Sequence, residues 1–288
     1  MSDKPQLPIL SPLKDRFLPL VQDINQQRRE VVGRVRAIDM LRWDGTPYGD
    51  HPLQCMFIHE LNDLCPRDGW PTVVLIHGGG WKEGSKRDFA SLAPKLAKHG
   101  LMCAAIDYRL IPEAKWPDPL EDVTAALEFL RRQQVDPTRI VLWGFSAGAH
   151  LALMAAHKHP DWIRAVVAVA TPTDLTVLPR ESTEDLCTAD QLREASPLWQ
   201  SPGKLPPRLL LHGSQDAISP IDSVRDYARI HDAELLEVAG GDHGLRRPLR
   251  SAFKARSQAE KWLIQQMDLP KRLSKWKNNR KKNKKGKG

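Results

Sequence analysis

The chain alternates between short apolar runs and segments whose apolar residues have helical spacing. Runs typical of strands covered on both faces lie at residues 71–77, 101–108, 139–145, 163–170, 208–213 and 233–240. Helical spacing is found at residues 88–100, 119–134, 147–159, 223–230 and 254–267. Buried strands separated by helices predict an α/β fold with a mostly parallel sheet and helices on both of its faces.

Two parts of the chain depart from this alternation. Residues 31–43 and 53–61 are strand-like and are separated by the turn sequence DGTPYGDHP, which predicts an antiparallel pair ahead of the parallel strands. Residues 171–207 interrupt the rhythm and are rich in proline, threonine, serine and acidic residues. We expect them to form an insertion over one end of the sheet, in the position of a partial lid.

The sequence GFSAGAH, residues 144–150, joins an apolar strand to a helical segment. Its first five residues match the G-x-S-x-G nucleophile elbow, in which a sharp strand-to-helix turn exposes a serine hydroxyl. Glycine leaves room for such a turn where a side chain would clash. An ordinary serine in a glycine-containing turn is the alternative, but the strand before it and the helix after it favour Ser146 as a nucleophile.

A serine hydroxyl is a weak nucleophile, so it requires a base and donors for the oxyanion. The sequence HGGGW, residues 77–81, follows an apolar strand and matches the oxyanion loop of lipases and esterases. Its glycines allow backbone N–H groups to approach a substrate oxygen, which predicts an oxyanion hole formed by Gly79, Gly80 and Ala147. We expect His77, at the end of the strand, to brace this loop rather than act as the base.

The acid and the base of such an enzyme follow the serine in the chain order serine, aspartate or glutamate, histidine. Asp216 stands just after an apolar strand, at the carboxyl end where an open α/β sheet gathers its active-site groups. His243 lies in a glycine-bounded loop after the next strand. Asp242 is the rival acid, but adjacent side chains in such a loop seldom point at each other, so we favour Asp216. We expect His150 and His212 to pack near the site rather than act as bases.

Taken in chain order, HGGGW, DYRLIPEAKWPDPLEDV (residues 107–123), GFSAGAH, HGSQD and GGDHG resemble the motifs of the α/β-hydrolase superfamily. Within it, the chain is similar to hormone-sensitive-lipase-like carboxylesterases, small bacterial feruloyl or acetyl esterases and kynurenine formamidases, over about residues 30–267. The resemblance implies an eight-stranded, mostly parallel sheet, no cofactor or metal, and acyl transfer to water in two steps. By position it makes Ser146 the nucleophile, His243 the base and Asp216 the residue that orients the base.

The resemblance leaves the substrate open. Phe145 stands where lipase-like relatives often have aspartate, and together with His150 it is closer to the feruloyl-esterase and formamidase side. We expect a serine carboxylesterase that hydrolyses small esters, with an aryl formamide as the alternative substrate and a non-catalytic ligand-binding protein as a remoter alternative. Trp81 and Phe145 are the expected substrate-binding residues, whereas Trp116 and Trp199 belong either to the pocket or to the core.

Positive charge is concentrated at the end of the chain. The 288 residues carry a formal net charge of +8, but the last eighteen, KRLSKWKNNRKKNKKGKG, contain ten Lys or Arg residues and no acid. Because the remainder is nearly neutral, this segment alone makes the protein basic. We predict that residues 269–288 form a disordered tail that keeps the protein soluble or contacts polyanions weakly.

The rest of the composition is that of an ordinary globular protein, with 41% hydrophobic and 27% charged residues. We expect one domain at residues 31–268, after an N-terminal extension at residues 1–30. The four cysteines lack metal-like spacing, the first residues lack a secretory signal pattern, and no apolar run reaches the length of a membrane span. These features predict a cytoplasmic protein that acts on a small-molecule ester and requires no nucleic acid, and they leave its oligomeric state open.

Overall fold

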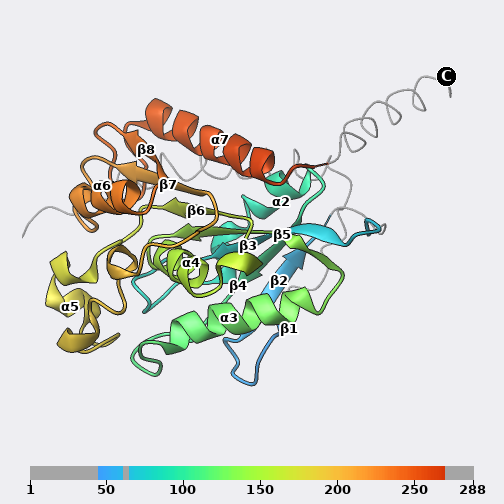
Figure 1. Cartoon of the computed structure of the whole chain (residues 1–288), viewed down its shortest axis with the longest axis horizontal. Helices are drawn as coiled ribbons and strands as arrows, with labels where there is room; N and C mark the ends of the chain where they lie inside the picture. Colours follow the sequence, from blue (N-terminus) through green and yellow to red (C-terminus); the bar gives the residue numbers. More distant parts are fainter. Residues whose placement is uncertain (1–44, 61–64, 270–288) are drawn as a thin grey trace, which may run out of the picture. The chain divides into compact units, whose positions relative to one another are not determined.

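The computed structural model describes residues 45–60 and 65–269, which belong to one compact unit. Eight strands form one sheet in the order β1-β2-β4-β3-β5-β6-β7-β8 (Figure 1). β2 is antiparallel to both of its neighbours, and all other pairs are parallel. This arrangement confirms the expected α/β fold with a mostly parallel, eight-stranded sheet. The extension expected at 1–30, the strand expected at 31–43 and nearly all of the tail expected at 269–288 lie outside the described residues.

The central strands are buried on both faces. The eight strands are β1 (Thr46–Pro47), β2 (Cys55–His59), β3 (Trp70–Ile76), β4 (Met102–Ile106), β5 (Val135–Phe145), β6 (Ala165–Val169), β7 (Arg208–Gly213) and β8 (Glu234–Val238). Every residue of β3, β4, β6 and β7 is buried. Strands covered by helices on both sides need apolar residues at every position rather than at alternate ones, which explains the continuous apolar runs.

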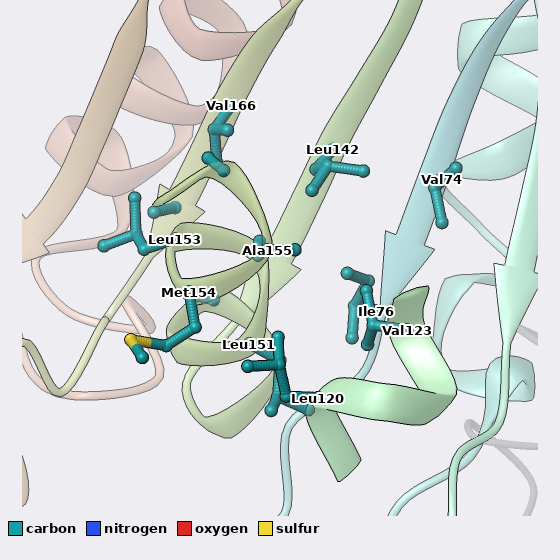
Figure 2. Packing of buried hydrophobic residues seen from close by; sticks show 14 of the residues in the cluster. Val74, Ile76, Leu120, Val123, Leu142, Leu151, Leu153, Met154, Ala155 and Val166 are labelled. Atoms are coloured by element: carbon teal, nitrogen blue, oxygen red, sulfur yellow. The ribbon is translucent and has the colours of Figure 1, made fainter. Parts of the chain in front are cut away.

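Helices cover the two faces of the sheet in two groups (Figure 1). α3 (Asp118–Arg131), α4 (Ala147–Lys158) and α6 (Ile221–Ile230) pack on one face, and α2 (Ala93–Ala97) and α7 (Leu249–Gln266) pack on the other. Figure 2 shows part of the first cluster, in which apolar side chains of α3 and α4 lie beside the strand residues Val74, Leu142 and Val166. Each fully buried side chain of this size stabilises the fold by roughly 1.5–3 kcal/mol.

Two expectations about local structure were wrong in extent. The helix expected at 88–100 is divided into a 3₁₀ turn, η1 (Lys86–Phe89), and the short helix α2. A capping box between Ser85 and Asp88 starts the 3₁₀ turn, and Pro94, which has no N–H to donate within a continuous helix, stands in the first turn of α2. The expected turn at 44–52 contains β1, which pairs with β2 through Thr46 and Met56.

Residues 171–207 connect β6 to β7 through four short helices, η3 (Leu175–Val177), α5 (Arg180–Thr183), η4 (Ala189–Gln191) and η5 (Pro197–Trp199). Several long-range hydrogen bonds tie the segment to the rest of the unit, and two of them join it to the segments around Ser146. The Trp116 N–H donates to the Leu186 carbonyl at 2.7 Å, and the Ala195 carbonyl lies 2.6 Å from His150 Nε2. Among the described residues, no helix is long and apolar enough to cross a membrane.

Candidate active site

Ser146 lies in a strained turn between β5 and α4. Its backbone has φ 51° and ψ −118°, a region that side-chain-bearing residues seldom adopt. The Ser146 N–H donates to the Val169 carbonyl of β6 at 2.8 Å, which holds the turn in place. Two residues later, a Cβ on Gly148 would lie 2.1 Å from the Ile76 carbonyl oxygen. Only glycine therefore lets α4 start against the end of β3, and this close approach fixes where the Ser146 hydroxyl stands.

The structure brings Ser146, His243 and Asp216 together, although they come from three different loops. His243 Nε2 lies 2.9 Å from Ser146 Oγ, and His243 Nδ1 lies 2.7 Å from Asp216 Oδ2. The three loops follow β5, β7 and β8, so parallel strands deliver all three side chains to the same edge of the sheet. This continuous hydrogen-bonded chain is the arrangement by which an imidazole accepts a hydroxyl proton while a carboxylate orients it.

Asp216 is held as a carboxylate by four donors. Its Oδ1 accepts N–H bonds from Ile218 and Ser219, both at 2.9 Å. Its Oδ2 lies 3.2 Å from His212 Nε2 in addition to the contact with His243. Burial by itself raises the pKa of Asp216, but the hydrogen bonds from His212, His243 and the Ser219 N–H outweigh burial and hold that pKa well below its usual range.

Asp242, the rival acid, is used elsewhere in the loop. Its Oδ1 accepts the Arg246 N–H at 2.7 Å, which closes a local turn beside His243. The carboxylate next to His243 in the sequence is therefore not the one that contacts the imidazole. Two adjacent residues of an extended or turning chain direct their side chains apart, whereas Asp216 approaches from a separate strand.

His212 is closer to the site than the sequence indicates. We expected it to pack nearby, but it contacts the carboxylate of Asp216 directly, and its Nε2 also lies 2.9 Å from the Ser219 carbonyl. A carbonyl oxygen only accepts, so this contact places the proton of the imidazole on Nε2, where it also faces Asp216. The sequence HGSQD could have indicated this contact, because it places His212 near the end of β7 and Asp216 shortly after the strand.

The backbone N–H groups predicted to form the oxyanion hole are unpaired in the described residues. The N–H groups of Gly79, Gly80 and Ala147 have no hydrogen-bond acceptor among the described residues. Ala147 is the first residue of α4, where the helix leaves N–H groups free and its dipole is positive. Gly79 has a φ of 110°, and a Cβ there would lie 2.1 Å from the Glu83 carbonyl oxygen, so the tight loop requires glycine.

His77 packs against the HGGGW loop and supports it. Its Nδ1 lies 2.7 Å from the Gly78 carbonyl, and its ring stacks on Tyr108 with centroids 4.4 Å apart. The Tyr108 hydroxyl in turn donates to the His77 carbonyl at 3.0 Å. Burial lowers the pKa of His77, although the contact with Gly78 partly opposes this effect. A neutral imidazole packed in this way supports the loop and does not face Ser146.

The four aromatic residues considered for the substrate occupy different surroundings. The Phe145 ring lies 5.7 Å from the ring of His243, next to the reacting groups. Trp81 and Trp116 are buried and contact the imidazole of His150, with ring centroids 5.2 Å and 5.6 Å away. Trp199 is 48% exposed on the insertion. Trp116 therefore belongs to the buried cluster on α4, whereas Trp199 is not part of the core.

Metal ligands do not gather in this part of the chain. Within residues 45–60 and 65–269, no group of three or more His, Cys, Asp or Glu side chains has an arrangement that would hold a metal ion. The four cysteines all lie in these ranges, and each is a free thiol.

Known proteins resemble the chain in both sequence and structure. The BD-FAE family model matches residues 65–229. Esterase LipC of Mycobacterium tuberculosis is 27% identical over 236 residues, which cover 68% of this chain and 58% of LipC. The probable isoprenylcysteine alpha-carbonyl methylesterase ICME of Oryza sativa is 35% identical over 112 residues, which cover 38% of this chain and 27% of that protein. The chain thus spans about half the length of the first curated relatives it matches.

Solved structures give the same fold. Thermogutta terrifontis esterase 2, phosphoramylated by tabun, superposes with a TM-score of 0.68 at 25% identity and covers 79% of this chain and 96% of its own. A truncated carbohydrate esterase from gut microbiota has a TM-score of 0.67 at 20% identity, with 79% and 96% of the two chains covered. Since the family model matches more than half of the residues, the chain belongs to the BD-FAE family, and its described residues have an α/β-hydrolase fold.

Proposed function

We propose that the chain is a serine carboxylesterase that cleaves small carboxylic esters through an acyl-enzyme on Ser146. The hydrogen-bonded chain from Ser146 through His243 to Asp216 carries this proposal. The names of the relatives support it, because LipC is named an esterase and another relative, LipM of Mycobacterium tuberculosis, is named a probable carboxylic ester hydrolase. The covalent phosphorus adducts of Thermogutta terrifontis esterase 2 are consistent with a nucleophile in that fold.

In the first half of the reaction, His243 Nε2 takes the proton of Ser146 as Oγ attacks the acyl carbon. The N–H groups of Gly79, Gly80 and Ala147 donate to the oxyanion that forms. His243 then gives the proton to the departing alcohol oxygen, and the acyl group remains on Ser146. Because Asp216 stays ionised, it stabilises the imidazolium during both proton transfers.

In the second half, water replaces the alcohol. His243 removes a proton from the water as its oxygen attacks the acyl carbon, and it returns that proton to Oγ of Ser146 when the acid leaves. The same three N–H groups stabilise the second oxyanion. Loss of one such donor costs an enzyme roughly 3 kcal/mol of transition-state stabilisation, so the unpaired amides account for a large share of the proposed rate enhancement.

The insertion at 171–207 is proposed to form the partial lid of this site. Its attachment to His150 and Trp116 supports that role, because His150 stands one helical turn after Ser146. Trp81, in the oxyanion loop, contacts the same imidazole. We propose that Trp81 and Phe145 contact the substrate and that the insertion limits its size, which favours small esters. The cytoplasmic location and the absence of a required nucleic-acid partner remain predictions from the sequence.

Hydrolysis of an aryl formamide uses the same three side chains and is the alternative reaction. The buried indole rings of Trp81 and Trp116 beside His150 are compatible with an aromatic substrate. The relatives cited above carry ester-hydrolase names, which favours the ester. A panel of phenyl and alkyl esters beside N-formyl anilines separates the two reactions, because the preferred class will have the higher kcat/KM.

The experiment that tests the proposal compares the wild-type protein with Ser146→Ala on p-nitrophenyl acetate and on paraoxon. We expect the wild type to turn over the ester and to gain one diethylphosphoryl group on Ser146, located by peptide mass spectrometry. The Ser146→Ala protein should do neither while unfolding at the same temperature as wild type. Ester turnover or phosphorylation that survives the substitution would overturn the assignment of Ser146.

A further inference from the structure

Six large apolar side chains of the described unit stay exposed. They are Val177, Trp199, Ile218, Ile230, Leu249 and Phe253. Val177 and Trp199 lie on the insertion that follows β6, Ile218 lies two residues after Asp216, and Leu249 and Phe253 lie at the start of α7. Exposed apolar side chains that lie together on one element, rather than singly, indicate that something covers them.

The start of α7 shows this feature most clearly. The helix buries a stripe made of Ala252, Ala255, Ala259 and Leu263 against the sheet. At 100° per residue, Leu249 and Phe253 lie about 75° and about 115° around the helix axis from the middle of that stripe. Both point toward solvent and are 76% and 73% exposed. The core therefore does not account for these two side chains.

Basic residues surround the two exposed apolar side chains. Arg246, Arg247, Arg250 and Lys254 are all exposed, and none of their side chains forms an ion pair with any residue that the structure describes. We name the surface formed by Arg246, Arg247, Leu249, Arg250, Phe253 and Lys254 the α7 patch. Asp242, which precedes this surface in the chain, accepts the Arg246 backbone N–H and forms no ion pair with these four side chains.

We propose that the α7 patch docks the protein on an anionic lipid surface. A bilayer of anionic lipids offers phosphate oxygens to the four cations and hydrocarbon to Leu249 and Phe253 at the same time. A nucleic acid satisfies only the first of these requirements, because its phosphates would pair with the cations and leave both apolar side chains in water. Charge complementarity together with the paired exposed side chains therefore selects the lipid.

The patch also stands beside the site. It begins three residues after His243, in the loop that leads from β8 to α7. Docking through it would set the edge that carries Ser146 against the membrane surface, where esters dissolved in the lipid are concentrated. This last consequence rests on the proposed esterase activity, but the docking itself does not.

Sedimentation with vesicles tests the docking directly. We would measure partition of the full chain on phosphatidylcholine vesicles and on vesicles that also contain phosphatidylglycerol. The Leu249→Ser/Phe253→Ser protein should lose about tenfold or more in partition on the anionic vesicles, because the apolar contacts are gone. The Arg250→Gln/Lys254→Gln protein should lose roughly twentyfold to thirtyfold there and show little change on phosphatidylcholine alone.

Ile230→Ser is the matched control, because it removes an exposed aliphatic side chain that lies outside the patch, and it should bind as wild type. Every variant keeps the Lys-rich tail, so any contribution of the tail is common to all of them. Partition of Leu249→Ser/Phe253→Ser equal to wild type, or wild-type partition that ignores phosphatidylglycerol, would overturn the proposal. The proposal would also be overturned if the wild type and both double variants bound a DNA duplex more tightly than they bind the anionic vesicles. Ser146→Ala should bind vesicles as wild type does, so the docking and the esterase proposals fail separately.

Discussion

Replacing Asp216 by asparagine tests the role of one carboxylate oxygen at the centre of the proposed site. In the structure, Oδ1 accepts N–H bonds from Ile218 and Ser219, and Oδ2 lies 2.7 Å from His243 Nδ1. An asparagine of the same shape keeps Oδ1 as the acceptor of the two N–H groups. Its amide nitrogen then replaces Oδ2 and meets His243 Nδ1 as a second donor. Two donors cannot share a hydrogen bond, so the imidazole must carry its proton on Nε2 instead.

With the proton on Nε2, His243 no longer accepts the proton of Ser146, and the nucleophile loses its base. In triads of this kind the aspartate-to-asparagine change lowers kcat by roughly 10⁴-fold. That factor corresponds to about 5.5 kcal/mol of transition-state stabilisation. In the wild type, His212 Nε2 lies 3.2 Å from Oδ2 of Asp216. In the variant, the amide nitrogen takes the place of this oxygen and faces His212 as a second unpaired donor. We therefore expect a loss of unfolding free energy of about 1–3 kcal/mol in addition to the loss of kcat.

The assay is steady-state hydrolysis of p-nitrophenyl acetate, with urea unfolding measured on the same preparations. Asp242→Asn is the matched control, because it makes the same change in the neighbouring carboxylate, whose Oδ1 accepts the Arg246 N–H and can still do so as an amide oxygen. We expect Asp242→Asn to retain kcat within about threefold. The reasoning is refuted if Asp216→Asn keeps more than about a tenth of the wild-type kcat, or if Asp242→Asn loses more activity than Asp216→Asn.

Three further substitutions test the support around the site. His212→Phe removes one donor from the carboxylate that orients the base, so kcat should fall about tenfold at unchanged KM, and His212→Asn, whose amide can donate, should recover part of it. Gly148→Ala forces a Cβ to within 2.1 Å of a β3 carbonyl and should lower unfolding free energy by about 2–4 kcal/mol in urea titrations, whereas Gly203→Ala, with no atom within 4 Å, should not. Burial lowers the pKa of His150 from 6.5 to about 4, against the weaker opposing effect of its hydrogen bond. The folded state therefore binds fewer protons, and its stability is complete above about pH 6.5 and falls as the pH drops toward 4. In urea titrations, the free energy of unfolding should fall by about 2 kcal/mol more in the wild type than in a His150→Phe protein by pH 5.

The central strands of the sheet could be predicted closely because they are buried on both faces. β7 has the bounds expected from its apolar run, and β6 lies within its predicted range. The helix at 88–100 could not be predicted, because both of its halves satisfy apolar periodicity and only the capping at Ser85 and the position of Pro94 divide it. Periodicity reports which face of a segment is buried, but it does not report where the backbone hydrogen bonds are interrupted.

The side chains that meet at the proposed site could also be anticipated, and for a topological reason. Parallel strands end at the same edge of the sheet. Ser146, Asp216 and His243 each come directly after a parallel strand, so the topology alone brings them together. Trp116 and Trp199 had no such guide, since burial depends on which distant segment packs over each. The Leu186 carbonyl of the insertion binds the backbone of Trp116 and buries it beside His150, whereas Trp199 ends η5 and stays exposed. Catalytic residues placed at strand ends can thus be predicted from the sequence. The contacts between the insertion and α4, which surround the proposed substrate pocket, are formed only in the folded chain.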